Sequence, residues 1–157
     1  MITIRKAELA DVAAMSGVLI GSITELCLED HRGNAEAIAS WTANKTPESV
    51  ARWVADEKLT MLVAEHGGEI AAVGALTAPD EIGLNYVAPA HRFMGVSRAL
   101  LKAMEAIMRD NGVAEGKLNS SATARQFYRA AGWIDVDGPL SGRLVAGYPM
   151  RKRLSDE

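Results

Sequence analysis

This sequence has a single cysteine and no strong excess of charge of either sign. The single cysteine, Cys27, excludes an internal disulfide and favours the reducing cytoplasm as the compartment. Lys and Arg number 17 against 20 Asp and Glu, a net charge of -3, which disfavours a general nucleic-acid binder. No stretch approaches the ~18 consecutive apolar residues of a membrane span, and the first residues lack a secretory signal pattern. We therefore expect neither a nucleic-acid nor a membrane partner.

Familiar metal and nucleotide motifs are also missing. His31, His66 and His91 lie far apart in the sequence, and no His-Glu-x-x-His or Cys-x-x-Cys spacing occurs. These spacings hold zinc in many proteins, so no metal site is predicted. There is no Gly-x-x-x-x-Gly-Lys-Ser/Thr, and no Gly-x-Gly-x-x-Gly follows a strand. The common phosphate loops that those patterns encode are therefore excluded.

The chain does contain enough apolar residues for a real core, and its patterns alternate between strand and helix. Hydrophobic residues make up 48% of the 157 positions. Period-two and period-3.6 patterns predict the elements. Strands are expected at 2–5, 59–65, 70–76, 82–87, 117–120, 133–136 and 144–154, and helices at 12–26, 35–43, 47–57, 96–110 and after 121. Residues 29–34 are polar and read as a loop. We expect one mixed α/β domain over residues 1–157.

The turn before the 96–110 helix is a candidate ligand site. Strand 82–87, this helix and strand 117–120 have the length of a strand–helix–strand crossover, which would place both strands parallel in one sheet. Free amides at the helix N-terminus, from Met94 to Ser97, would then favour a phosphate, helped by the charges of Arg92 and Arg98. The alternative is that Ser97 is an ordinary helix cap and that the two arginines are solvated.

Two motifs resemble one family. Val87-x-Pro89-x-x-Arg92-x-x-Gly95-Val96-Ser97 resembles the acetyl-CoA signature of the GNAT superfamily of N-acetyltransferases, Val-x-Pro-x-x-Arg/Gln-x-x-Gly-x-Gly/Ala. The block from Leu118 to Trp133 is similar to the family's second element, Asn … Ala-x-x-Phe-Tyr-x-x-x-Gly-Phe/Trp. The order of the predicted elements fits as well, so the resemblance spans nearly the whole chain. Ser97 departs from it, because the family usually has Gly or Ala there.

The resemblance implies a fold and a cosubstrate. The fold would be a central mixed, mostly antiparallel sheet with splayed parallel strands and about four to five flanking helices. Acetyl-CoA would be the cosubstrate, with its pantetheine arm lying between the splayed strands against the backbone of Tyr86 and Val87. The cofactor-binding residues would be Tyr86, Val87, Arg92, Phe93, Met94, Gly95, Val96, Ser97, Arg98, Asn119 and Arg125. Arg125 could instead face water.

The resemblance also implies a reaction, the transfer of an acetyl group to a primary amine by direct attack. Tyr128 matches the family's tyrosine that protonates the leaving thiolate; the alternative is a half-buried core residue beside Phe127. Glu81 is the candidate base, because strand alternation from Glu81 to Val87 would turn its side chain to the same cleft. The alternative for Glu81 is a solvated turn carboxylate. His31 is expected to be a surface histidine rather than a base.

The partners are less defined by the sequence. The acceptor amine could belong to a small molecule or a protein. A non-catalytic acyl-CoA-binding sensor or subunit of the same fold is the alternative function. The segment from Leu144 to Leu154 could pair with a second copy of the chain in a homodimer.

Overall fold

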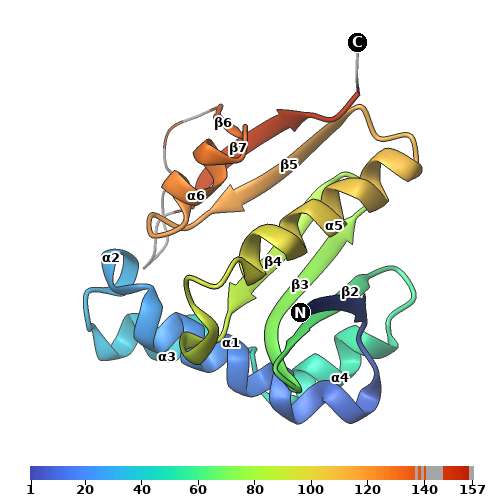
Figure 1. Ribbon diagram of the computed structural model, residues 1–157. Coiled ribbons are helices and arrows are strands. Elements are labelled where there is room, and N and C mark those ends of the chain that lie inside the picture. The colour runs from blue at the N-terminus through green and yellow to red at the C-terminus, as the bar shows by residue number, and fades with distance from the viewer. Residues whose placement is uncertain (137, 139, 141–146, 156–157) are drawn as a thin grey trace.

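The computed structural model describes residues 1–136, 138, 140 and 147–155, and its strands form one seven-stranded sheet (Figure 1). The order across the sheet is β1-β2-β3-β4-β5-β7-β6. The strands are β1 (Ile2–Lys6), β2 (Thr60–His66), β3 (Glu69–Ala78), β4 (Glu81–Val87), β5 (Glu115–Ser120), β6 (Ile134–Asp135) and β7 (Tyr148–Arg153). Only β4 and β5 pair in parallel; the other neighbours are antiparallel. The expected mixed, mostly antiparallel sheet is confirmed, and residues 144–146 of the last predicted strand lie outside the described residues.

The predicted helices are present, with one short addition. They are α1 (Val12–Leu26), α2 (Leu28–His31), α3 (Ala35–Thr42), α4 (Pro47–Ala55), α5 (Val96–Asp110) and α6 (Arg125–Ala130). Short 3₁₀ turns precede α1 (Leu9–Asp11, η1) and follow β4 (Pro89–His91, η2). Within the described chain α2 is the extra helix, since the sequence predicted a polar loop there.

His31 connects α2 to the end of α1. It is 2% exposed, and its Nε2 lies 2.8 Å from the carbonyl oxygen of Ile23, near the end of α1. The amide of Gly33 donates to its Nδ1 at 3.0 Å, so Nε2 carries the proton and donates to Ile23. The expectation of a surface histidine is therefore wrong. With both ring nitrogens bonded, His31 has no free lone pair to act as a base.

Helices cover both faces of the sheet. Along β2, Met61 and Val63 face the core formed with α1 and α4, whereas Leu62 and Ala64 face the core formed with α5. This alternation buries both faces of the strand, as expected for a sheet between two helical layers. In Figure 1, α5 lies in front of β3 and β4, and α1 runs below them.

One helical stretch, Leu9–Leu26, is long and apolar enough to cross a membrane by length and composition, which the sequence pattern had not indicated. This is weak evidence, because a core helix of a soluble protein passes the same test. Met15, Leu19 and Ile23 are fully buried within the fold. The stretch is accounted for as a helix that packs on the sheet.

The sheet has two parts joined by a short seam. β4 and β5 pair only at Glu81–Lys117 and Ile82–Leu118, and no pairing follows toward their carboxyl ends. We call β1 to β4 the first arm and β5, β7 and β6 the second arm. In Figure 1 the second arm and α6 lie above α5, and the first arm with α1, α3 and α4 lies below. The strands splay as the resemblance implied.

Candidate active site

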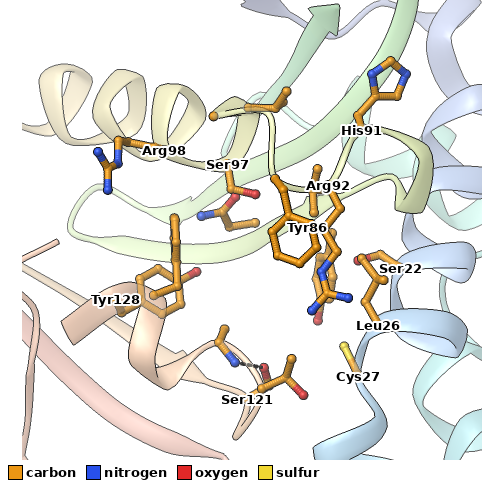
Figure 2. Close-up of a pocket in the computed structure, with 18 residues that line it drawn as sticks. Ser22, Leu26, Cys27, Tyr86, His91, Arg92, Ser97, Arg98, Ser121 and Tyr128 are labelled. Carbon is orange, nitrogen blue, oxygen red and sulfur yellow. Dashed lines mark hydrogen bonds between the residues drawn. The ribbon is translucent and has the colours of Figure 1, made fainter. Parts of the chain in front are cut away.

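A cleft of about 540 Å³ opens where the two arms diverge (Figure 2). Four segments line it: the end of α1, the end of β4, the loop into α5, and the turn from β5 into α6. Figure 2 shows Ser97 and Arg98 at the start of α5, Tyr128 and Ser121 on the second arm, and Cys27 at the end of α1. The cleft thus collects residues that are up to about a hundred positions apart in the sequence.

The register of β4 decides which backbone groups face this opening. The amide of Ala88 donates to Ala71 on β3, and the same regular pairing continues to Tyr86 opposite Val73. In an antiparallel ladder every second residue turns its amide and carbonyl away from the partner strand. Val87 and Asn85 therefore present these groups to the gap before β5. Of the two residues expected to act through their backbone, Val87 fits and Tyr86 does not; Tyr86 lines the cleft with its side chain.

The loop into α5 offers a row of unpaired amides. Phe93 and Gly95 have positive φ angles of 68° and 80°, which turn successive amides to one side. In the described chain, no hydrogen bond is found for the amides of residues 93–98; the first helical bond joins the Ala99 amide to Gly95. Such a helix N-terminus favours an anion. Gly95 adopts this left-handed geometry without strain, and a Cβ there would meet nothing.

Ser97 is not the cap of this helix. The N-cap position is Gly95, and no side chain caps the helix. Ser97 instead lines the cleft, as do its neighbours Val96 and Arg98. The alternative in which Ser97 closes the helix end is therefore wrong, and the amides stay available.

The two arginines lie differently. Arg92 has its guanidinium 4.5 Å from the ring centre of exposed Phe93, and in Figure 2 it reaches toward the end of α1. Arg98 lies in the first turn of α5, and in Figure 2 its side chain points away from Arg92. Both line the cleft. They bracket the unpaired amides with permanent positive charge.

Tyr128 lies on the second arm side of the cleft. It is 6% exposed and packs edge-on against Phe127 and Trp133. Burial raises the pKa of Tyr128 to about 12, partly offset by the Asn85 side chain. The phenol is therefore neutral throughout the physiological range and can donate a hydrogen bond into the cleft. Its apolar packing and its place in the cleft are compatible, so the two sequence interpretations do not exclude each other.

A narrower cavity of about 50 Å³ occupies the gap between β4 and β5 themselves. Asn85 and Tyr128 line both this cavity and the main cleft. Asn119, on β5, lines the narrow cavity only. The gap thus carries polar groups from both arms and connects to the tyrosine.

Glu81 is not brought to the cleft. The pairing of β3 with β4 shifts between Ala75 and Leu76, leaving Gly83 as an extra residue on β4, where a Cβ would collide with the side chain of Thr77. Because of this bulge Ile82 packs in the same core as Val87, so neighbouring Glu81 lies on the opposite face. Its carboxylate accepts the Thr77 hydroxyl at 3.2 Å. The predicted alternation was wrong, and a base at Glu81 has no support from this geometry.

Arg125 is also held elsewhere. Its guanidinium lies 4.1 Å from the ring centre of Tyr148, and Nη2 donates to Asp135 at 3.2 Å. It does not line the cleft. A bulge and a tertiary ion pair are invisible in strand and helix periodicity, so the sequence could not place either Glu81 or Arg125.

Sequence reasoning missed the residues that α1 and α2 contribute. Asp30 accepts the amides of Ala122 and Thr123 at 2.6 and 3.0 Å and the Thr123 hydroxyl at 2.6 Å, which ties α2 to the turn beside Tyr128. Cys27 lines the cleft, and burial, reinforced by Asp30, raises the pKa of its thiol to about 12. Nothing in the local pattern marks these contacts, since they join positions about ninety residues apart.

The described lining of the cleft contains no Asp or Glu. It includes His91, but this ring is engaged on both sides: Nδ1 lies 3.0 Å from Nδ1 of His66, and Nε2 lies 2.8 Å from Glu69. Among the described residues no group of three potential ligands could hold a metal ion. The polar chemistry of the cleft therefore rests on amides, two arginines, an asparagine, the Cys27 thiol and the hydroxyl groups of serine, threonine and tyrosine side chains.

Comparisons with known proteins agree with this geometry. The model of the acetyltransferase (GNAT) domain family matches residues 27–154. Among solved structures, an N-acetyltransferase from Rhodopseudomonas palustris is 22% identical with a TM-score of 0.86, over 96% of this chain and 94% of that one. The PaiA N-acetyltransferase from Thermoplasma acidophilum, in complex with coenzyme A, is 20% identical with a TM-score of 0.83, over 98% and 99%.

A third structure, the ribosomal-protein-alanine N-acetyltransferase from Brucella melitensis, is 22% identical with a TM-score of 0.72, over 96% of this chain and 99% of that one. No curated protein sequence matches the chain. At these identities the structures show a shared fold. The family model covers most of the chain, including the α5 loop and Tyr128, and on that ground the chain belongs to the GNAT acetyltransferase family.

Proposed function

We propose that the chain, as one domain over residues 1–157, transfers the acetyl group of acetyl-CoA to a primary amine in the cytoplasm. The row of unpaired amides from residue 93 to 98, opening on a cleft continuous with the β4–β5 gap, carries this proposal. These amides suit a pyrophosphate between Arg92 and Arg98. The gap suits an extended pantetheine arm, with Val87 and Asn119 on its two sides. The structurally similar PaiA enzyme is described in complex with coenzyme A.

The residues of the cleft have distinct roles in this proposal. Acetyl-CoA would supply a thioester whose carbonyl carbon the amine attacks. The Val87 amide, which faces the gap, would donate to the carbonyl oxygen as negative charge develops there. Tyr128, neutral because its pKa is about 12, would donate a hydrogen bond to the sulfur as the thiolate leaves. The proton lost by the amine balances the proton that the thiolate gains.

Direct attack is favoured over an acetylated enzyme. Cys27 is the thiol in the cleft, and its pKa of about 12 keeps it protonated and a poor nucleophile. No carboxylate lines the described cleft, so the amine would lose its proton to solvent before attack. A lysine-like alkylamine has a pKa of about 10.4, and only its neutral form attacks.

Binding is tested by thermal unfolding with acetyl-CoA, CoA, ATP or NAD. A ligand at a hundredfold excess over its Kd stabilises the fold by about 2.7 kcal/mol, or about 5–10 °C for this size. We expect both CoA species to raise the midpoint and the other nucleotides to leave it unchanged. A midpoint that ignores both CoA species would contradict the proposal.

Turnover is tested by release of the CoA thiol with a panel of amines that includes spermidine, methylamine and an alanyl peptide. Tyr128→Phe removes one hydroxyl, and we expect kcat to fall about 100-fold or more with the Kd for CoA unchanged. Tyr148→Phe is the matched control, because Tyr148 does not line the cleft, and its kcat should equal that of the parent. Equal loss in both variants would remove Tyr128 from the mechanism.

The absence of a carboxylate from the described cleft favours a second candidate, an acyl-CoA-binding sensor or subunit without turnover. It predicts the same rise in unfolding midpoint with CoA and no thiol release with any amine of the panel. The two functions therefore separate in the turnover assay alone.

A further inference from the structure

A further cavity, of about 300 Å³, lies between α5 and the second arm, and we call it the α5–α6 cavity. Its apolar side is formed by Leu101, Phe127, Ala130 and Ala131. Arg98, seen at the start of α5 in Figure 2, and Phe127 line both this cavity and the main cleft. A ligand whose phosphate lies at the first amides of α5 is therefore next to the α5–α6 cavity on its Arg98 side.

The charges of this cavity leave two cations without a carboxylate. Glu105 is buried, and Lys152 neutralises it, because the Lys152 Nζ donates to its carboxylate at 2.9 Å and to the carbonyl oxygen of Ala131 at 2.8 Å. The two other cations that line the cavity are Arg98 and Lys102, and among the described residues neither forms an ion pair. Both are exposed, so a ligand can reach their charged ends.

Arg98 and Lys102 are four residues apart on α5. This spacing puts both side chains on one face of the helix, one turn or about 6 Å apart along its axis. Two charges of the same sign at this spacing repel each other and destabilise a helix. An anion bound beside them would remove that repulsion, so this face of α5 is suited to a negatively charged group.

On the basis of the acetyl transfer proposed above, we propose that Lys102 binds the 3′-phosphate of acetyl-CoA and selects CoA over dephospho-CoA. In that proposal the pyrophosphate lies at the amides of residues 93–98, beside Arg98. The pyrophosphate of CoA is attached to the 5′ carbon of a ribose that carries the third phosphate on its 3′ carbon. The two phosphate groups are thus one ribose apart, a span comparable to the helical turn between Arg98 and Lys102.

A lysine at this position also accounts for discrimination among nucleotides. A phosphate monoester carries a charge of about −1.5 to −2 at neutral pH, so it attracts an ammonium group strongly. ATP has the adenosine and a 5′ phosphate chain but no 3′-phosphate. The apolar side of the α5–α6 cavity would receive the nucleoside in either case, and the contact with Lys102 would form with CoA alone.

The affinities of CoA and dephospho-CoA, measured by isothermal titration calorimetry, test this proposal. The parent should bind CoA about 5- to 20-fold more tightly, because dephospho-CoA lacks the charge-assisted contact. Lys102→Met keeps the length of the side chain, and it should weaken CoA by the same factor and change dephospho-CoA less than twofold. Lys58→Met, an exposed lysine outside both cavities, is the control and should keep the ratio of the parent. A general loss of folding would affect both ligands equally and leave this ratio unchanged.

Equal affinities of the parent for the two ligands would overturn the role of Lys102 and leave the acetyl transfer intact. A preference for CoA that persists in Lys102→Met would also overturn it, because another residue would then bind the 3′-phosphate. Inorganic phosphate tests the other source of a phosphate group. If it raises the unfolding midpoint of the parent and not of Lys102→Met, while the two CoA forms bind equally, the cavity is a site for free phosphate and the proposal is wrong. If the parent binds neither CoA form, the proposed function fails, and the role of Lys102 fails with it.

Discussion

The two arms of the sheet differ in their number of strands and in how many helices pack against them. The first arm has four strands paired antiparallel along most of their length, with α1 and α4 on one face and α5 on the other. The second arm is a short three-stranded piece with α6, and it joins the first arm through only two paired positions. The gap that this short seam leaves is the cleft. A sheet with complete β4–β5 pairing would bury the backbone groups of Val87 and leave no site.

Side-chain contacts, rather than strand pairing, hold the arms together beyond the seam. Glu105 on α5 is 4% exposed and accepts hydrogen bonds from Trp133 and Lys152 of the second arm at 3.0 and 2.9 Å. At the mouth of the cleft, Asp30 reaches the turn before α6. The cleft can therefore stay open without the arms coming apart.

The largest expected effect comes from cutting the contact through Glu105. Lys152→Met removes the cation that lies 2.9 Å from this buried carboxylate and leaves Arg109 at 3.7 Å. Removing the nearer cation from a buried carboxylate should cost about 3 kcal/mol of stability, the lower end of the range for a broken buried pair because Arg109 remains; urea unfolding measures it. Arg153→Met, an exposed neighbour on β7, is the control and should change stability by less than about 0.5 kcal/mol. Equal effects would mean that the arms do not depend on this contact.

A smaller effect is expected at the mouth of the cleft. Asp30→Asn keeps the shape but weakens three charge-assisted hydrogen bonds to residues 122 and 123, so we expect about 2 kcal/mol of lost stability. The KM for acetyl-CoA should also rise, because the turn beside Tyr128 is less fixed. Glu29→Gln, an exposed carboxylate on the same helix, serves as the control for both measurements. A KM that rises equally in both variants would count against a specific role for Asp30.

The smallest expected effect on stability comes from removing one ion pair in each arm. In the first arm, Arg5 donates two hydrogen bonds to Asp11 at 2.8 and 2.9 Å, and this contact lowers the pKa of Asp11 below its usual value of 3.8. Asp11→Asn should cost about 1 kcal/mol in urea unfolding at pH 7. A carboxyl whose folded pKa is lowered stabilises the fold above pH 3.8, and this contribution is lost as the pH falls through the folded pKa.

The matched pair in the second arm is Glu115 with Arg151, a single contact of 3.4 Å between side chains about half exposed. Glu115→Gln should change stability by less than about 0.5 kcal/mol at any pH. If Glu115→Gln lowered stability as much as Asp11→Asn, exposed ion pairs would stabilise the second arm as strongly as Arg5 and Asp11 stabilise the first. The proposed difference between the two arms would then be wrong.

Local patterns were enough to predict most of the fold. Alternation along 60–66 and 69–78, the glycine pair between them, and the apolar stripe of 96–110 each report a single element and its buried face. Two motifs that resemble those of the GNAT superfamily then predicted the splayed sheet and the loop at Gly95. What local patterns could not give was any feature that depends on register, as the β4 bulge at Gly83 shows.

The site was predicted only in part, because local patterns report some of its residues and not others. The amide row and Tyr128 lie inside contiguous motifs, and the structure brings both to the cleft. Glu81 was misplaced because the bulge reverses the faces of β4 beyond Gly83. Asp30 and Cys27 were missed because they reach the cleft through tertiary packing alone. Asn85 did carry a signal, a polar residue inside an apolar strand, and the structure places this residue in the lining of both the cleft and the narrow cavity between the arms.

Amide hydrogen exchange with and without CoA tests the central claim, that the gap between the arms is the cosubstrate site, most directly. The amides of residues 93–98 have no hydrogen-bond partner in the described chain, and the Val87 amide faces the gap. These amides should exchange fast in the free protein and be strongly slowed by CoA, with no change on addition of NAD. Unchanged exchange at Val87 and at residues 93–98 under saturating CoA would contradict the account, because the cosubstrate would then bind elsewhere.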